Sequence, residues 1–144
     1  MPLRFRFRKI ERPQPLGPKS MPMIPIRLKG ANGEAFDTMA LVDSGADYSV
    51  IFSEHAEILG IDLAKLEQTD AMGVGGKVDA WRCKIETEIS GKAEHLKYRM
   101  LLPFLIIQKP AENHPILLGR AGFFEEFEII FKEKRREVVL KPVE

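Results

Sequence analysis

The sequence contains a single cysteine, Cys83, and no long apolar run. One cysteine excludes an intramolecular disulfide and any metal site built from several thiolates. No stretch approaches the roughly 18 apolar residues that a membrane-spanning helix needs. The first residues, MPLRFRFRKI, alternate arginine with apolar residues and lack the apolar core of a signal peptide. We therefore expect a cytoplasmic protein without a membrane segment.

Neither sign of charge is in excess. Lysine and arginine number 22 and aspartate and glutamate 21, which gives a net charge of +1. Nucleic-acid-binding domains usually carry a basic face, so this balance argues against nucleic acid as the main partner. With 144 residues, 44% hydrophobic and 30% charged, the chain has the size and composition of one soluble globular domain.

Short stretches with a period of two dominate the chain, as is typical of half-buried β-strands. Residues 3–10 alternate apolar side chains with arginines, and residues 77–89 alternate apolar with charged ones. Asn32-Gly33 predicts a hairpin. The expected strands are 3–10, 23–29, 34–42, 48–52, 67–73, 77–89, 95–102, 104–107, 116–118, 128–132 and 137–141.

The remaining expected elements are two short helices and a connector. Ser53 is expected to cap a helix that Gly60 ends, and residues 121–127 form the second helix. Pro25 places its strand at a sheet edge, because proline cannot donate to a ladder. Proline-rich residues 11–22 predict an extended connector. The sequence thus predicts an all-β barrel or sandwich, with residues 1–19 as an N-terminal arm and residues 20–144 as the domain.

An apolar strand runs directly into Asp43-Ser44-Gly45-Ala46, after which the chain returns to apolar residues. This pattern places a carboxylate at the end of a buried strand, on a tight turn that Gly45 permits. Taken alone, Asp-Ser-Gly is also ordinary turn chemistry. A second apolar strand ends at Gly119-Arg120, where the arginine alone would indicate a surface residue or a structural ion pair.

A glycine-rich segment, residues 73–76, lies between two expected strands. A phosphate-binding loop would need a helix after the glycines, whereas the residues from Lys77 onward alternate like a strand. The pattern therefore disfavours a nucleotide site. It favours a mobile hairpin tip, which serves either as a lid or as an ordinary flexible hairpin.

Together, these three segments resemble the retropepsin-type aspartic proteases. The family's Asp-Thr/Ser-Gly-Ala motif matches residues 43–46, its glycine-rich flap matches residues 72–76, and its second motif, two apolar residues and Gly-Arg, matches residues 117–120. The order and approximate spacing agree over residues 23–142, and the tail is similar to free-standing prokaryotic members. The resemblance implies a closed all-β barrel with one lobe per chain and one or two short helices.

The resemblance also implies a role for each matching residue. Asp43 is the catalytic carboxylate, and Ser44, in place of the commoner threonine, would bond to a partner chain's backbone. Asp47 and Arg120 occupy positions that form an internal ion pair in retroviral members. Contact with the substrate is implied for Gly45, Ala46, Asp47, Val50, Val74, Gly75, Gly76, His114, Pro115 and Leu117.

The implied mechanism needs two carboxylates, whereas the sequence has one Asp-Ser-Gly. We therefore expect a homodimer in which Asp43 of each chain lies on a two-fold axis. The two carboxylates would share one proton, activate a water and cleave an extended peptide or protein substrate without a cofactor or metal. The alternative is a non-catalytic peptide-binding or scaffolding module on the same fold.

Other chemistry-bearing residues carry less weight. The histidines, His55, His95 and His114, lack metal-ligand spacing, so we expect surface or loop positions. Cys83 alternates with Trp81 and predicts a packed thiol rather than a reactive one. The arginines of residues 3–10 are interpreted as the polar face of a strand, with contact to acidic partners as the alternative.

Overall fold

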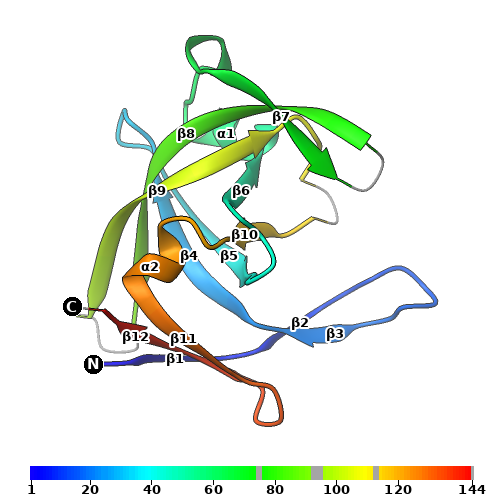
Figure 1. Ribbon diagram of the computed structural model, residues 1–144, viewed down its shortest axis with the longest axis vertical. Coiled ribbons are helices and arrows are strands. Elements are labelled where there is room, and N and C mark those ends of the chain that lie inside the picture. The colour runs from blue at the N-terminus through cyan, green and yellow to red at the C-terminus, as the bar shows by residue number, and fades with distance from the viewer. Residues whose placement is uncertain (74–75, 92–95, 112–113, 144) are drawn as a thin grey trace.

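A computed structural model describes residues 1–73, 76–91, 96–111 and 114–143 (Figure 1). In its largest sheet, β4 is the first strand in the pairing order and also pairs with β8, near the other end of that order, so the sheet closes on itself. The all-β prediction with short helices is confirmed. In pairing order, the strands of this sheet are β4 (Met23–Lys29), β5 (Ala35–Val42), β10 (Ile116–Leu118), β6 (Ser49–Phe52), β9 (Lys97–Ile107), β8 (Gly76–Ser90) and β7 (Gln68–Gly73).

Two smaller sheets lie below this ring in Figure 1. In the first, β12 (Glu137–Pro142) pairs with both β1 (Leu3–Arg6) and β11 (Phe127–Lys132), so the expected C-terminal hairpin is confirmed. In the second, β2 (Arg8–Ile10) pairs with β3 (Lys19–Met21). The expected strand at 3–10 is therefore broken at Phe7: its N–H still donates to the Arg136 carbonyl at 2.8 Å, but from Arg8 onward the chain pairs with β3 instead of β12. The expected connector ends in a strand because Lys19–Met21 pair with Arg8–Ile10.

Two prolines lie within strands, each at a position where the strand pairs with another strand on one side only. The prediction that β4 is an edge strand is wrong for Arg27–Lys29, which pair with β8, but Pro25 lies before that pairing begins. The expected break between residues 102 and 104 is also wrong. Pro103 pairs with Lys84 on one side, and β6 begins to pair on the other side only at Phe104. In both strands the proline is tolerated because its missing N–H faces no partner strand.

Helices α1 (Ser53–Ile58) and α2 (Phe123–Glu126) are short, and η1 (Leu63–Lys65) is a single 3₁₀ turn. The expected Ser53 cap is wrong: Phe52 precedes the helix, and its N–H donates to Nδ1 of His55 at 3.0 Å. His55 is 9% exposed, contrary to the surface position expected for it. No described helix is long and apolar enough to cross a membrane.

The core fills the ring and extends to the lower sheet through Leu3, which is 2% exposed. In β8, the predicted inward residues Ile85 and Ile89 are buried, at 3% and 0% exposure. Glu88, predicted to face outward, is only 4% exposed. Its carboxylate is accommodated because it accepts a hydrogen bond from Arg99 at 2.9 Å.

Candidate active site

Asp43 follows the last residue of β5, where that strand runs parallel to β10. Its backbone N–H donates to the Leu118 carbonyl at 3.0 Å, which ties the start of the turn to β10. Its carboxylate oxygen Oδ1 accepts from the Gly45 N–H at 2.9 Å. The half-buried carboxylate is therefore oriented by its own turn before any ligand arrives.

The turn that carries Asp43 and the segment after β10 are joined by their backbones. The N–H of Arg120 donates to the Ala46 carbonyl, and the N–H of Ala121 donates to the Asp47 carbonyl, both at 2.8 Å. These bonds bring together two of the three segments that the sequence singled out. They hold the Asp43 turn, which connects β5 to β6, against the C-terminal end of β10.

Gly119 lies at the point where these two segments approach most closely. A Cβ atom there would lie 2.3 Å from the Tyr48 carbonyl oxygen and 2.8 Å from that of Ala46, so no side chain fits. The Gly119 N–H donates to Oγ of Ser49 at 3.1 Å, and Ser49 is fully buried. Sequence reasoning missed Ser49, although a lone hydroxyl between a turn and an apolar strand is a signal for it.

The ion pair implied for Asp47 and Arg120 is not formed in the single chain. Both side chains are exposed, and none of the ion pairs among the described residues joins them. Their two segments are joined by the backbone bonds from Arg120 to Ala46 and from Ala121 to Asp47. The support of the site expected from Asp47 and Arg120 stays a prediction.

The remaining predicted residues differ in how far they are exposed. Val50 of β6 is 8% exposed and pairs with Leu117 of β10, directly beside the Asp43 turn. Pro115 is half-buried, and the exposed His114 ring lies 5.6 Å from that of Phe52. The exposed residues of the turn are Ser44, Gly45 and Asp47, and Ala46 is half-buried.

The predicted flap corresponds to the hairpin of β7 and β8, in which Gly73 pairs with Gly76. Gly76 is exposed and has a φ of +107°, which favours glycine. Val74 and Gly75, which were predicted to contact the substrate, lie outside the described residues, as does His95. The hairpin itself is confirmed, and its role as a lid stays a prediction.

A hollow of about 320 Å³ opens beside Asp43 and Ser44. Phe131 of β11 lines it and is 40% exposed. Earlier on the same face of β11, Phe127 is only 3% exposed and Ile129 packs against the core. Phe131 thus extends an inward-facing apolar row beyond the core, which no local sequence pattern indicated.

Other reactive groups lie away from this turn. Cys83 on β8 is half-buried and packs against the core, and burial raises the pKa of its thiol, as expected for a packed cysteine. Within the part of the chain that the structure describes, no three His, Cys, Asp or Glu side chains are grouped as a metal ion would require.

Comparison with known proteins places these observations in a family. The family model described as "Aspartyl protease" matches residues 24–121, a range that contains the Asp43 turn, the β7–β8 hairpin and Gly119-Arg120. Comparison with curated protein sequences gives no match. The crystal structure of a retropepsin-like aspartic protease from Rickettsia conorii is similar over 97% of this chain and 98% of that one, with a TM-score of 0.63 and 16% identity.

The structural similarity establishes the retropepsin-like fold, and the family match covers most of the chain. Both findings support aspartic protease activity in general. The chain belongs to the aspartyl protease family.

Proposed function

We propose that this protein is an aspartic endopeptidase that acts as a homodimer, with Asp43 of both chains forming one catalytic pair. The observation that carries the proposal is the Asp43 carboxylate, fixed by the Gly45 N–H at the end of a buried strand. The sequence offers no second Asp-Ser-Gly motif, so a partner chain must supply the second carboxylate.

The proposed mechanism follows from placing two carboxylates side by side. Two like charges at short distance cannot both be ionised readily, so the pair holds one shared proton, as in other aspartic proteases. The ionised Asp43 takes a proton from a bound water, which then attacks the peptide carbonyl. The protonated Asp43 donates to the developing oxyanion. The tetrahedral intermediate then collapses with breakage of the C–N bond, the carboxyl that took the water proton gives it to the leaving amine, and the hydroxyl proton of the intermediate returns to the other carboxylate, which restores the singly protonated pair. No covalent intermediate forms in this scheme.

The other residues of the turn would position the substrate and the partner chain. An extended substrate would pair its backbone with the Gly45 carbonyl below and with the β7–β8 hairpin above, including Val74, Gly75 and Gly76. The Ser44 hydroxyl, exposed beside Asp43, is available to the partner's backbone. Side-chain pockets would be lined by Ala46, Asp47, Val50, His114, Pro115 and Leu117.

The surface around Asp43 supports a second copy. Phe131 lines the same hollow as Asp43 and Ser44, and 40% of this aromatic residue is exposed. An apolar side chain on an inward-facing row is stabilised when another surface covers it. A two-fold axis close to Asp43 would place a partner chain over this hollow.

The test is cleavage of a mixed peptide library by the wild-type protein and by Asp43→Asn, with products detected by mass spectrometry. Asp37→Asn is the matched control, because it makes the same change at an exposed position on β5, the strand that leads to Asp43. We expect cleavage by the wild type and the control and none by Asp43→Asn. Cleavage by a pure Asp43→Asn preparation would refute the assignment.

The same experiment separates the enzyme from a non-catalytic peptide-binding module. In the second case, the wild type would retain library peptides without cutting any of them. A statine-type inhibitor, whose hydroxyl replaces the attacking water, should compete for the catalytic pair. Binding of peptides without cleavage by a dimeric wild-type protein would favour the module.

A further inference from the structure

A groove runs along the outer face of β4, away from the Asp43 turn. It consists of two adjoining hollows of about 350 and 530 Å³ that share Pro25 and Ser90 in their walls. The first lies between β4 and the ends of β8 and β9, and the second continues toward β1. No residue assigned to the catalytic site lines either hollow, so the groove is a separate feature.

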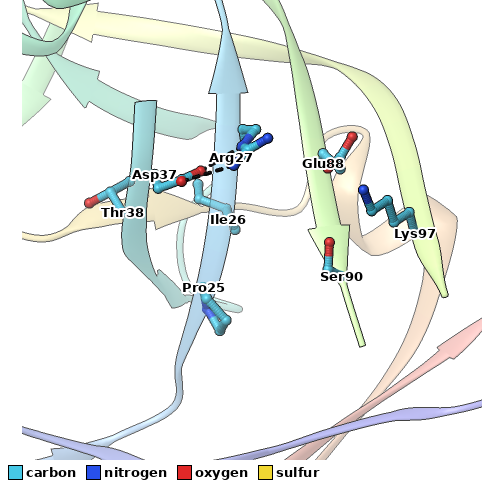
Figure 2. A pocket seen from close by; sticks show the side chains of 8 residues that line it. All are labelled: Pro25, Ile26, Arg27, Asp37, Thr38, Glu88, Ser90 and Lys97. Atoms are coloured by element: carbon cyan, nitrogen blue, oxygen red, sulfur yellow. Dashed lines mark hydrogen bonds and ion pairs between the residues drawn. The ribbon is translucent and has the colours of Figure 1, made fainter. Parts of the chain in front are cut away.

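The groove exists because β4 and β8 separate. Their pairing runs from Lys29↔Glu86 to Arg27↔Glu88 and stops there. Figure 2 shows Pro25 on β4 and Ser90 on β8 on opposite sides of the resulting gap. Among the described residues, Met23–Ile26 pair only with β5 and have no strand on the other side. In the β4–β5 register the backbone groups of Ile24 and Ile26 face β5, so an extended backbone can pair on this open edge with Met23 and with the Pro25 carbonyl.

The walls of the groove present positive charge. Arg4, Arg6 and Arg8 line the second hollow from the polar side of β1 and its continuation, and Lys97 lines the first. Arg6 and Arg8 form none of the ion pairs found among the described residues. Apolar Phe5 and Met23 lie between these charges and give the groove a partly apolar floor.

Each carboxylate among the described residues that line the groove has a basic partner. Asp37 is held by Arg27 at 2.7 and 3.0 Å, as the dashed lines in Figure 2 show. Glu88 lies 2.9 Å from Arg99 and 3.5 Å from Lys29. The remaining Glu137 lies 3.3 Å from Arg4. Among the described residues that line the groove, the positive charge available to a ligand is therefore that of Arg6, Arg8 and Lys97.

We propose that this groove binds an extended, acidic polypeptide segment of a partner protein. Glutamate or aspartate side chains would meet Arg6 and Arg8, interspersed apolar side chains would cover Phe5, and the segment's backbone would align with the open edge of β4. A nucleic acid fits less well, because its continuous phosphates would pass the carboxylates in the walls and, among the described residues that line the groove, Phe5 is the one aromatic residue.

The test measures fluorescence anisotropy of a labelled peptide in which glutamate alternates with valine. The variant Arg6→Ala/Arg8→Ala removes the two arginines, and Lys134→Ala/Arg135→Ala removes two exposed charges from the β11–β12 turn as a matched control. We expect the first variant to bind roughly fivefold more weakly than wild type and the control to bind equally well. Added salt should weaken the wild-type interaction.

Lys97→Ala provides a second, independent variant at the other end of the groove and should also weaken binding. Circular dichroism of each variant confirms that it is folded. The proposal is overturned if the peptide does not bind, if both double variants bind it equally, or if a peptide with lysine in place of glutamate binds as well. Preferential binding of oligothymidylate would likewise overturn it in favour of nucleic acid.

Discussion

A hydrogen bond at the start of α1 and burial of the ring both favour the neutral form of the His55 side chain. Its Nδ1 accepts the Phe52 N–H at 3.0 Å, and the Phe36 and Phe52 rings lie 5.6 and 5.9 Å from its ring. Burial lowers its pKa from the ordinary value of 6.5, and nearby Glu54 opposes this shift. Protonation would remove the acceptor and place a charge among aromatic rings.

Acid should therefore destabilise the fold through His55. The folded-state pKa is below the unfolded value of 6.5, so the unfolded chain binds the proton more readily. This contribution to stability is complete above pH 6.5 and is lost as the pH falls below it. Urea denaturation at a series of pH values measures the effect. His55→Asn keeps an acceptor but cannot titrate, so its stability should change less over this window; equal sensitivity of both proteins would contradict the prediction.

Gly119 makes a sharper prediction about the candidate site. In Gly119→Ala, the added Cβ meets backbone oxygens at 2.3 and 2.8 Å that cannot move without displacing the Asp43 turn. We expect a loss of about 3 kcal/mol in the free energy of unfolding, the upper end of overpacking costs. Loss of cleavage activity should accompany it.

Gly33→Ala is the control for this change. Gly33 has a φ of +91° but nothing within 4 Å of an added Cβ. Its cost is therefore backbone strain alone, about 1 kcal/mol. Urea denaturation of both variants compares the two costs. Equal stability of the two alanine variants would show that the backbone of residues 46–48 packs less closely against Gly119 than the structure indicates.

Two groups of ion pairs near the β4–β8 pairing differ in how far their carboxylates are buried. Their contributions to the free energy of unfolding can therefore be compared directly. The Glu88 carboxylate is 4% exposed and shared by Arg99 and Lys29, whereas Asp37 is 69% exposed beside Arg27. Hydrogen bonding to Arg99 lowers the pKa of Glu88, and Lys29 adds to this effect. A buried acceptor is costly to leave without its donor, while an exposed pair is screened by water.

Arg99→Ala should therefore destabilise the protein by about 1 kcal/mol, because Lys29 remains near the stranded carboxylate. Arg27→Ala should have a smaller effect, although its hydrogen bonds to Asp37 are just as short. Urea midpoints at neutral pH measure both. If Arg27→Ala lowers the urea midpoint more than Arg99→Ala does, hydrogen-bond geometry rather than burial determines how much these ion pairs stabilise the fold.

How far the sequence predicts the elements depends on whether their causes are local. The period-two alternation of residues 77–89 and the Asn32-Gly33 turn act over a few residues, and both hairpins are present. The errors arise where a distant segment decides the outcome. Pro103 continues β9 because β6 starts one position later, and Glu88 is buried because Arg99 reaches it from the next strand.

The candidate site likewise combines features with local causes and features that depend on distant segments. The turn at Asp43 and Gly45 could be predicted because its residues are contiguous in sequence, whereas the catalytic role of Asp43 stays a prediction. The contributions of Ser49 and Phe131 come from packing between separate strands, which no local pattern records. An ion pair was expected between the side chains of Asp47 and Arg120, whereas the described contacts between their segments are backbone bonds from Arg120 to Ala46 and from Ala121 to Asp47, and spacing alone does not distinguish the two.

On the scale of the whole molecule, the groove and the Asp43 hollow are two surfaces that the described residues leave uncovered. The groove beside β4 carries the charge of Arg6 and Arg8, whereas the hollow beside Asp43 carries the apolar ring of Phe131. Charge favours rapid, salt-sensitive association, and an apolar ring favours a lasting contact. This difference in chemistry assigns the hollow, rather than the groove, to the second copy that the proposed catalytic pair requires.

If this assignment holds, Phe131→Asp should give a folded monomer without protease activity, because dimerisation would bury an unpaired carboxylate. Ile130→Asp is the matched control: Ile130 is 36% exposed on the opposite face of β11 and should leave the dimer intact. Sedimentation measures the oligomeric state, circular dichroism the fold, and peptide cleavage the activity. Wild-type activity should fall on dilution through the dimer dissociation constant. A fully active, dimeric Phe131→Asp protein would place the interface elsewhere, and an active monomer would refute the shared catalytic pair.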